Sequence, residues 1–125
     1  MKIDVSIGEL IDKASILDIK IEKIKDKDKL KNIRYEYDLL LEALRKINLD
    51  AQSPEFLELK KINLRLWNIE DKIRLKEFRN EFDEEFIQLA RSVYRENDKR
   101  AEIKRAINLK FNSAIIEEKE YQKYI

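Results

Sequence analysis

Residues 83–111, DEEFIQLARSVYRENDKRAEIKRAINLKF, show a helical pattern over a longer stretch than any other part of the chain. Their apolar side chains recur at three- and four-residue steps, which predicts one helix of about 43 Å at 1.5 Å per residue. The composition agrees with a helical fold, because the 125 residues include only one glycine and one proline. A β-sandwich, a barrel or a doubly wound α/β fold needs many more turn residues. The sequence therefore predicts a nearly all-α protein.

Three more helices precede this one. Ser6 and Glu9 have the spacing of a capping box, and Ser53 followed by Pro54 is a strong helix start. With apolar stripes at helical spacing, these signals predict helices over residues 6–25, 28–47 and 54–76. We expect two antiparallel pairs in one domain, residues 1–125, forming an antiparallel bundle of four helices. Residues 113–125, SAIIEEKEYQKYI, are expected to add a C-terminal helical extension.

Two residue types are missing, and this excludes several kinds of chemistry. Without cysteine there is no disulfide, thiolate nucleophile or cysteine zinc site, and without histidine there is no Ser-His-Asp triad. A metal would have only oxygen ligands, which favours Mg²⁺, Mn²⁺ or Ca²⁺. Gly8 is the only glycine, so a glycine-rich phosphate loop is excluded. We expect no cofactor, no metal site and no catalytic residue of these classes.

Hydropathy and charge indicate the compartment and the partners. No apolar run approaches the roughly 18 residues of a membrane span, and MKIDVSIGEL lacks the apolar stretch of a signal peptide, so we expect a cytoplasmic protein. The net charge of +1 argues against nucleic acid as a partner. Residues 20–34 and 91–110 each hold seven basic against three acidic residues, whereas 36–58 hold six acidic against two basic. This pattern fits complementary surfaces of a solvated bundle, with an anion-binding groove as the alternative.

Polar side chains interrupt the apolar side of the helix at 83–111. At about 100° per residue, Glu96, Asn97, Arg100 and Lys104 fall on the same side as Leu89, Val93, Ile103 and Ile107, with Asn108 at the edge. A domain of this size cannot readily bury unpaired charges. These side chains are therefore exposed to solvent, paired in an internal network, or arranged around a cavity that binds an anion. Glu96 and Arg100, four residues apart, are the local candidates for an internal pair.

The preceding helix offers side chains that could complete such a site. Asn63, Trp67, Glu70 and Arg74 follow one another at spacings of four, three and four residues. Glu70 is a candidate to neutralise Lys104 or Arg100, and we interpret Trp67 as packing in the core or at the rim of the bundle. The candidate anion-binding site or polar network consists of Glu70, Arg74, Glu96, Asn97, Arg100, Lys104 and Asn108.

Several blocks of the sequence resemble a known family when they are taken together: SIGELIDKASILDIKIEKI (6–24), LWNIEDKIR (66–74), LARSVYRENDKRAEIKRAIN (89–108) and AIIEEKEY (114–121). They are similar to a family of small helical proteins, a domain of unknown function, in bacteria and their phages. The resemblance covers nearly the whole chain and implies no activity or cofactor. The family's characteristic polar residues correspond here to Glu9, Asp12, Lys13, Asp18, Glu70, Asp71, Arg74, Tyr94, Asn97, Asp98, Arg100, Lys104 and Asn108.

Two functions compete at this point. The first is a non-catalytic interaction or assembly module, which needs only amphipathic helices; the length of the fourth helix suggests that a second subunit covers part of it, as in a homodimer. The alternative is a small all-α enzyme or binder with a charged pocket for an anionic small molecule between the third and fourth helices. Helical chorismate mutases and helical nucleotide pyrophosphohydrolases work with such charged residues, but their spacing is not reproduced here.

Overall fold

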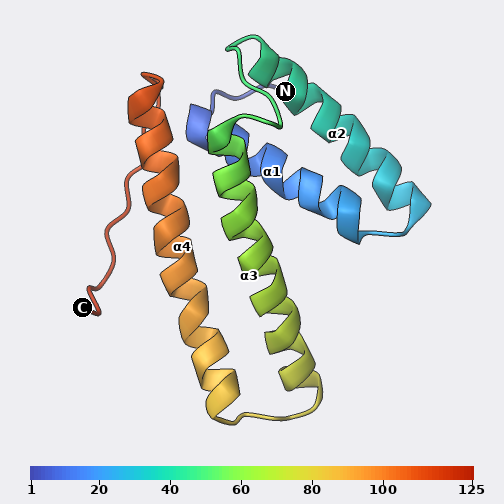
Figure 1. Ribbon diagram of the computed structural model, residues 1–125, viewed down its shortest axis with the longest axis vertical. Coiled ribbons are helices and arrows are strands. Elements are labelled where there is room, and N and C mark those ends of the chain that lie inside the picture. Colours follow the sequence, from blue (N-terminus) through green and yellow to red (C-terminus); the bar gives the residue numbers. More distant parts are fainter.

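The computed structural model describes all residues 1–125 and contains four helices and no strand. They are α1 (Ile7–Lys23), α2 (Lys27–Arg45), α3 (Pro54–Phe78) and α4 (Glu84–Lys110), shown in Figure 1. The predicted all-α bundle is confirmed, and no helix end differs from its predicted position by more than two residues. None of the helices combines the length and the apolar character that crossing a bilayer requires.

The helix starts use the side chains that the sequence indicated. Ser6 Oγ accepts the backbone N–H of Glu9 at 3.0 Å, and Asp83 accepts that of Phe86 at 3.0 Å. Ser53 precedes Pro54, the first residue of α3, but its side chain does not cap the helix. It accepts instead the backbone N–H of Asp50 at 3.0 Å, which stabilises the preceding turn.

Three of the four helices are followed, within three residues of their last residue, by an asparagine in the left-handed conformation. Asn48, Asn80 and Asn112 have φ angles of 60°, 53° and 52°. After each of them, a backbone N–H reaches back five residues to a helix carbonyl, as in Ser113 to Asn108 at 2.8 Å. This is the Schellman arrangement, in which glycine is the usual residue and asparagine the common substitute. A chain with one glycine therefore still ends its helices sharply.

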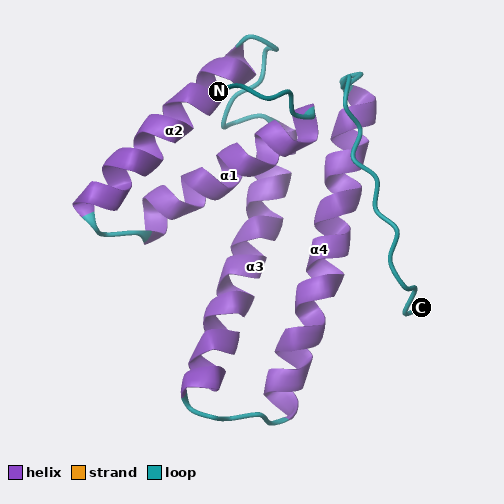
Figure 2. Cartoon of the chain, turned by 180° about the vertical axis from the view of Figure 1, so that it is seen from behind, coloured by secondary structure: helices purple, strands orange, loops and turns teal.

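The four helices form two hairpins, and α1 is the element that joins them (Figures 1 and 2). It contacts α2, α3 and α4, whereas α2 packs only against α1. The core lies where α1 crosses one end of the α3–α4 hairpin, and α2 and the α2–α3 loop close it with Leu44 and Leu49. The other end of the α3–α4 hairpin projects beyond α1 without a third helix against it.

The C-terminal residues correct one prediction, because no helix forms after Lys110. The segment instead runs back along α4 as an extended chain, here called the tail (residues 113–125) (Figure 2). Its contacts explain the conformation: Ser113 Oγ accepts the N–H of Ile7 at 3.1 Å, and Glu117 accepts Ser6 Oγ at 2.9 Å. Tyr124 lies against Tyr94, with ring centres 5.0 Å apart. Tertiary contacts thus override the local helical pattern.

Candidate functional site

A buried carboxylate at the crossing of α1 and α4 is the centre of the polar side chains. Asp12 of α1 is only 1% exposed and accepts Arg100 Nε at 2.9 Å, with a second bond from Arg100 Nη2. Asn63 of α3 donates to the same carboxylate at 2.8 Å. The hydrogen bond that Arg100 donates to Asp12 raises the pKa of Arg100 above its ordinary value, and the bidentate geometry makes this a strong pair.

Lys104 lies one turn further along α4 and contacts three carboxylates. Its Nζ is 2.6 Å from Glu9, 3.7 Å from Glu117 of the tail and 3.9 Å from Asp12. The glutamate at position 9 therefore bonds α4 through its side chain rather than closing the capping box with Ser6. Lys104 thereby ties the start of α1, α4 and the tail together.

The closest approach of α1 to α4 depends on the single glycine. The N–H of Gly8 donates to Asn108 Oδ1 at 2.6 Å. A Cβ atom at position 8 would lie 2.7 Å from the carbonyl oxygen of Lys104 and 2.9 Å from Asn108 Oδ1. Any larger residue would therefore push the two helices apart. Asn108 is itself buried, and its amide nitrogen has no hydrogen-bond partner.

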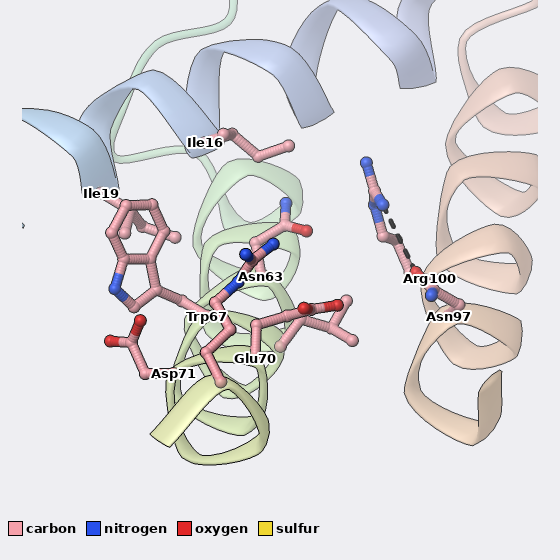
Figure 3. A pocket seen from close by; sticks show the side chains of 10 residues that line it. Ile16, Ile19, Asn63, Trp67, Glu70, Asp71, Asn97 and Arg100 are labelled. Atoms are coloured by element: carbon pink, nitrogen blue, oxygen red, sulfur yellow. Dashed lines mark hydrogen bonds between the residues drawn. The ribbon is translucent and has the colours of Figure 1, made fainter. Parts of the chain in front are cut away.

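A cleft of about 460 Å³ opens beside Arg100, below the point where α1 crosses the hairpin. Ile16 and Ile19 of α1 and Leu66 and Trp67 of α3 form its apolar wall. Figure 3 shows Glu70 and Asn63 on α3 and, across the cleft, Asn97 and Arg100 on α4. The complete lining is Ile16, Ile19, Asn63, Leu66, Trp67, Glu70, Asp71, Arg74, Asn97 and Arg100.

The structure separates the sequence-predicted site residues into three places. Glu70, Arg74, Asn97 and Arg100 line the cleft. Lys104 and Asn108 lie beyond it, against the start of α1. The remaining residue, Glu96, is 3.4 Å from Lys99 on its own helix and 3.9 Å from Arg65 on α3.

Two of the predicted pairings are wrong. Glu70 forms no ion pair with Lys104 or Arg100, and Glu96 does not pair with Arg100; their carboxylate partners are Glu9 and Asp12 of α1. The physical reason is the path of α1, which passes over this end of α4 and offers carboxylates that α3 does not bring within reach. Asp18, another acidic residue of α1, pairs with Lys60 of α3 at 3.1 Å.

A signal for Asp12 was present in the sequence. Gly8, Asp12, Ser15 and Ile19 are all buried and follow one another at spacings of four, three and four residues. They form a second buried stripe beside the apolar one, because α1 packs against helices on more than one side. Two parallel stripes on one short helix, one of them polar, are typical of a central helix rather than a surface helix.

No three acidic side chains of the chain lie where they could hold a metal ion.

Comparison with known proteins gives a family and no activity. Searches of the curated proteins and of the solved structures found no match. A family model described as "Family of unknown function (DUF6165)" matches residues 1–125. The match covers all four helices, the cleft and the tail, and it agrees with the resemblance to a domain of unknown function. The chain belongs to the family of unknown function DUF6165.

Proposed function

We propose that the protein is a non-catalytic assembly module that pairs with a second copy through the distal hairpin (residues 68–96). One observation carries the proposal: none of these residues is buried, although they include large apolar side chains. Phe78 is 85% exposed and Phe82 is 56% exposed, and both lie at the end of the hairpin farthest from α1. Two helices alone cannot cover all of their apolar surface, so a further packed layer would complete this part of the molecule.

The loop that presents these phenylalanines is held in place by a charge cluster. Lys76 lies 3.3 Å from Glu81, 2.8 Å from Asp83 and 3.2 Å from Glu85. Its hydrogen bond to Asp83 raises the pKa of Lys76 well above the ordinary range and lowers the pKa of the Asp83 carboxyl. An ordered loop loses less conformational entropy when a partner binds, which favours association.

The side of α4 that is available for pairing is apolar and flanked by opposite charges. Ile87, Ala90 and Tyr94 follow at spacings of three and four residues, so they lie along one side of the helix. Ile87 and Tyr94 are exposed large apolar residues. On the flank of this stripe are Glu84 and Arg95, both exposed, and neither forms an ion pair within the chain.

A two-fold axis near Ala90 would bring these features into register. In an antiparallel α4–α4 pair, Ile87 of one copy lies opposite Tyr94 of the second copy. Glu84 then lies on the same flank as Arg95 of the second copy, about one turn or less along the helix axis. The contact is centred on Ile87 and Ala90, and Tyr94 lies at its edge, where Tyr124 of the same chain already packs against one side of the ring. Hydrophobic contact and the Glu84–Arg95 pair favour this arrangement, and they must outweigh the repulsion between the two Arg91 side chains, which lie on the same flank near the axis.

Charge reversal tests the arrangement directly. Sedimentation equilibrium of the wild-type chain should give a dimer, whereas Glu84→Arg and Arg95→Glu should each be at least about tenfold weaker in association. The double variant Glu84→Arg/Arg95→Glu should recover the dimer, because the pair is restored with exchanged signs. Glu42→Arg and Lys31→Glu on the exposed side of α2 are matched controls and should leave the dimer unchanged. A monomeric wild-type chain, or a double variant as weak as the single ones, would contradict the proposal.

A further inference from the structure

We propose that the cleft below α1 binds a small zwitterion of the α-amino-acid class. Glu70, Asp71 and Arg74 of the distal hairpin line this cleft, whereas the proposed pairing uses the stripe of Ile87, Ala90 and Tyr94 on α4. Its volume of about 460 Å³ falls in the range of small-molecule sites, which are about 300–1,000 Å³. The apolar wall of Ile16, Ile19, Leu66 and Trp67 offers a place for an aliphatic or aromatic side chain.

Asn63 supplies a fixed acceptor at the inner end of this cleft. Its side chain is buried, with 6% of the residue exposed, and the amide nitrogen donates to Asp12 at 2.8 Å and to Ser15 at 2.9 Å. Both bonds point away from the cleft, so the orientation of the amide is set by the protein. The carbonyl oxygen accepts no hydrogen bond from the chain, and Figure 3 shows it pointing toward α4. The oxygen is therefore free to accept a hydrogen bond from a ligand in the cleft.

Charged side chains around the cleft are also without partners. Glu70, Asp71 and Arg74 line it, and none of them takes part in an ion pair. Other basic residues of the same helices do pair with carboxylates, namely Lys60, Lys76, Arg100 and Lys104. Across the cleft, Asn97 Oδ1 accepts Arg100 Nη1 at 3.4 Å, which leaves the amide nitrogen of Asn97 as a free donor. The cleft therefore offers carboxylates, a guanidinium group and an amide N–H within one small volume.

This combination favours a zwitterion over a simple anion. The charge of Arg100 is already balanced by Asp12, so the free charges of the lining are two carboxylates and one guanidinium group. An anion without a cationic group would meet net negative charge. An ammonium group suits Glu70 and the carbonyl of Asn63, while a carboxylate suits Arg74 and the amide of Asn97. The proposed ligand therefore differs from the anionic small molecule that the sequence analysis named as the alternative.

A thermal-shift panel of the twenty common L-amino acids tests the proposal, because a ligand that binds only the folded chain raises its melting temperature. We expect at least one amino acid with an apolar side chain, such as L-leucine, to do so. Calorimetry with L-leucine and two analogues then measures what each charged group contributes to binding. 3-Methylbutylamine lacks the carboxylate of leucine, and 4-methylpentanoate lacks its ammonium group. Each single-charge analogue should bind about tenfold or more weakly than the amino acid. If no amino acid stabilises the protein, or if 4-methylpentanoate binds as well as L-leucine, the proposal is wrong.

Variants assign the binding to this cleft. Glu70→Gln should weaken binding of the amino acid about tenfold and leave the melting temperature of the free protein unchanged, because Glu70 is exposed and unpaired. Glu77→Gln is the matched control, an exposed glutamate on the same helix outside the cleft. The non-pairing variant Arg95→Glu should retain full binding, which distinguishes this site from self-association. Equal effects of Glu70→Gln and Glu77→Gln would overturn the assignment.

Discussion

The two ends of the α3–α4 hairpin both have amphipathic helical sequences, but their environments differ. At the end crossed by α1, Phe56, Leu59 and Ile107 are buried and the polar side chains of α4 find partners on α1. In the distal hairpin, no residue is buried, and Lys76 forms ion pairs with carboxylates of the connecting loop and the start of α4. The difference shows that helical periodicity alone does not make a core. A third helix is needed, and α1 reaches only one end.

The largest effect is expected from the same substitution made at both ends. Phe56→Ala removes a side chain that is 1% exposed and should lower the free energy of unfolding by about 3–5 kcal/mol. Phe78→Ala removes one that is mostly in solvent, so the unfolding free energy of the monomer should change by less than about 0.5 kcal/mol. Urea denaturation of dilute protein measures both. Similar losses at the two positions would mean that the distal hairpin has a core of its own.

Removing the buried carboxylate should have the next largest effect. Asp12→Ala leaves Arg100 without its counter-ion and Asn63 without an acceptor, and we expect a loss of about 3 kcal/mol in unfolding free energy. In the distal hairpin, Glu81→Ala breaks one of the contacts of Lys76 and should cost less than about 1 kcal/mol. The same denaturation experiment compares the two. A loss of under about 1 kcal/mol for Asp12→Ala would show that the polar centre does not stabilise the fold.

A smaller effect should follow from adding one methyl group where α1 meets α4. Gly8→Ala should lower the unfolding free energy by about 1–2 kcal/mol, because the new Cβ would press on the backbone of Lys104. Within a helix, alanine is otherwise more stable than glycine by up to about 1 kcal/mol, so the sign of the change reports the contact itself. Thermal unfolding of the variant measures it. A stabilised variant would mean that the helices separate without cost.

The smallest expected effect is a pH-dependent change in the unfolding free energy, at the end of the hairpin that α1 crosses. A hydrogen bond from Lys110, 2.5 Å away, lowers the pKa of Glu55 below its ordinary value of 4.5. A carboxyl whose pKa is lower in the folded state stabilises the fold above the unfolded pKa and loses this contribution as the pH falls through the folded value. Lys110→Met should therefore be less stable than wild type at neutral pH, and the difference should shrink below pH 4.5. A difference that stays constant from neutral pH down to about pH 3 would contradict the assignment.

The helices could be predicted from the sequence, because their signals are local. The cap at Ser6, Pro54 at the start of α3 and the apolar stripes each depend on neighbouring residues. The extended form of the tail could not be predicted in this way, because it depends on a contact between Glu117 and Ser6, two residues that are far apart in the sequence. The inward direction of Arg100 followed from its helical phase, but its partner Asp12 depended on the path of α1.

Hydrogen exchange of the backbone amides, measured by NMR at low and at high protein concentration, compares the two ends in one sample. Amides of α1 and of residues 59–66 should exchange slowly at both concentrations, because their helices enclose the core. Amides of residues 87–94 should exchange quickly in dilute protein and more slowly when a second copy covers them. If residues 87–94 are equally protected at both concentrations, the distal hairpin is complete without a partner, and the proposed pairing is wrong.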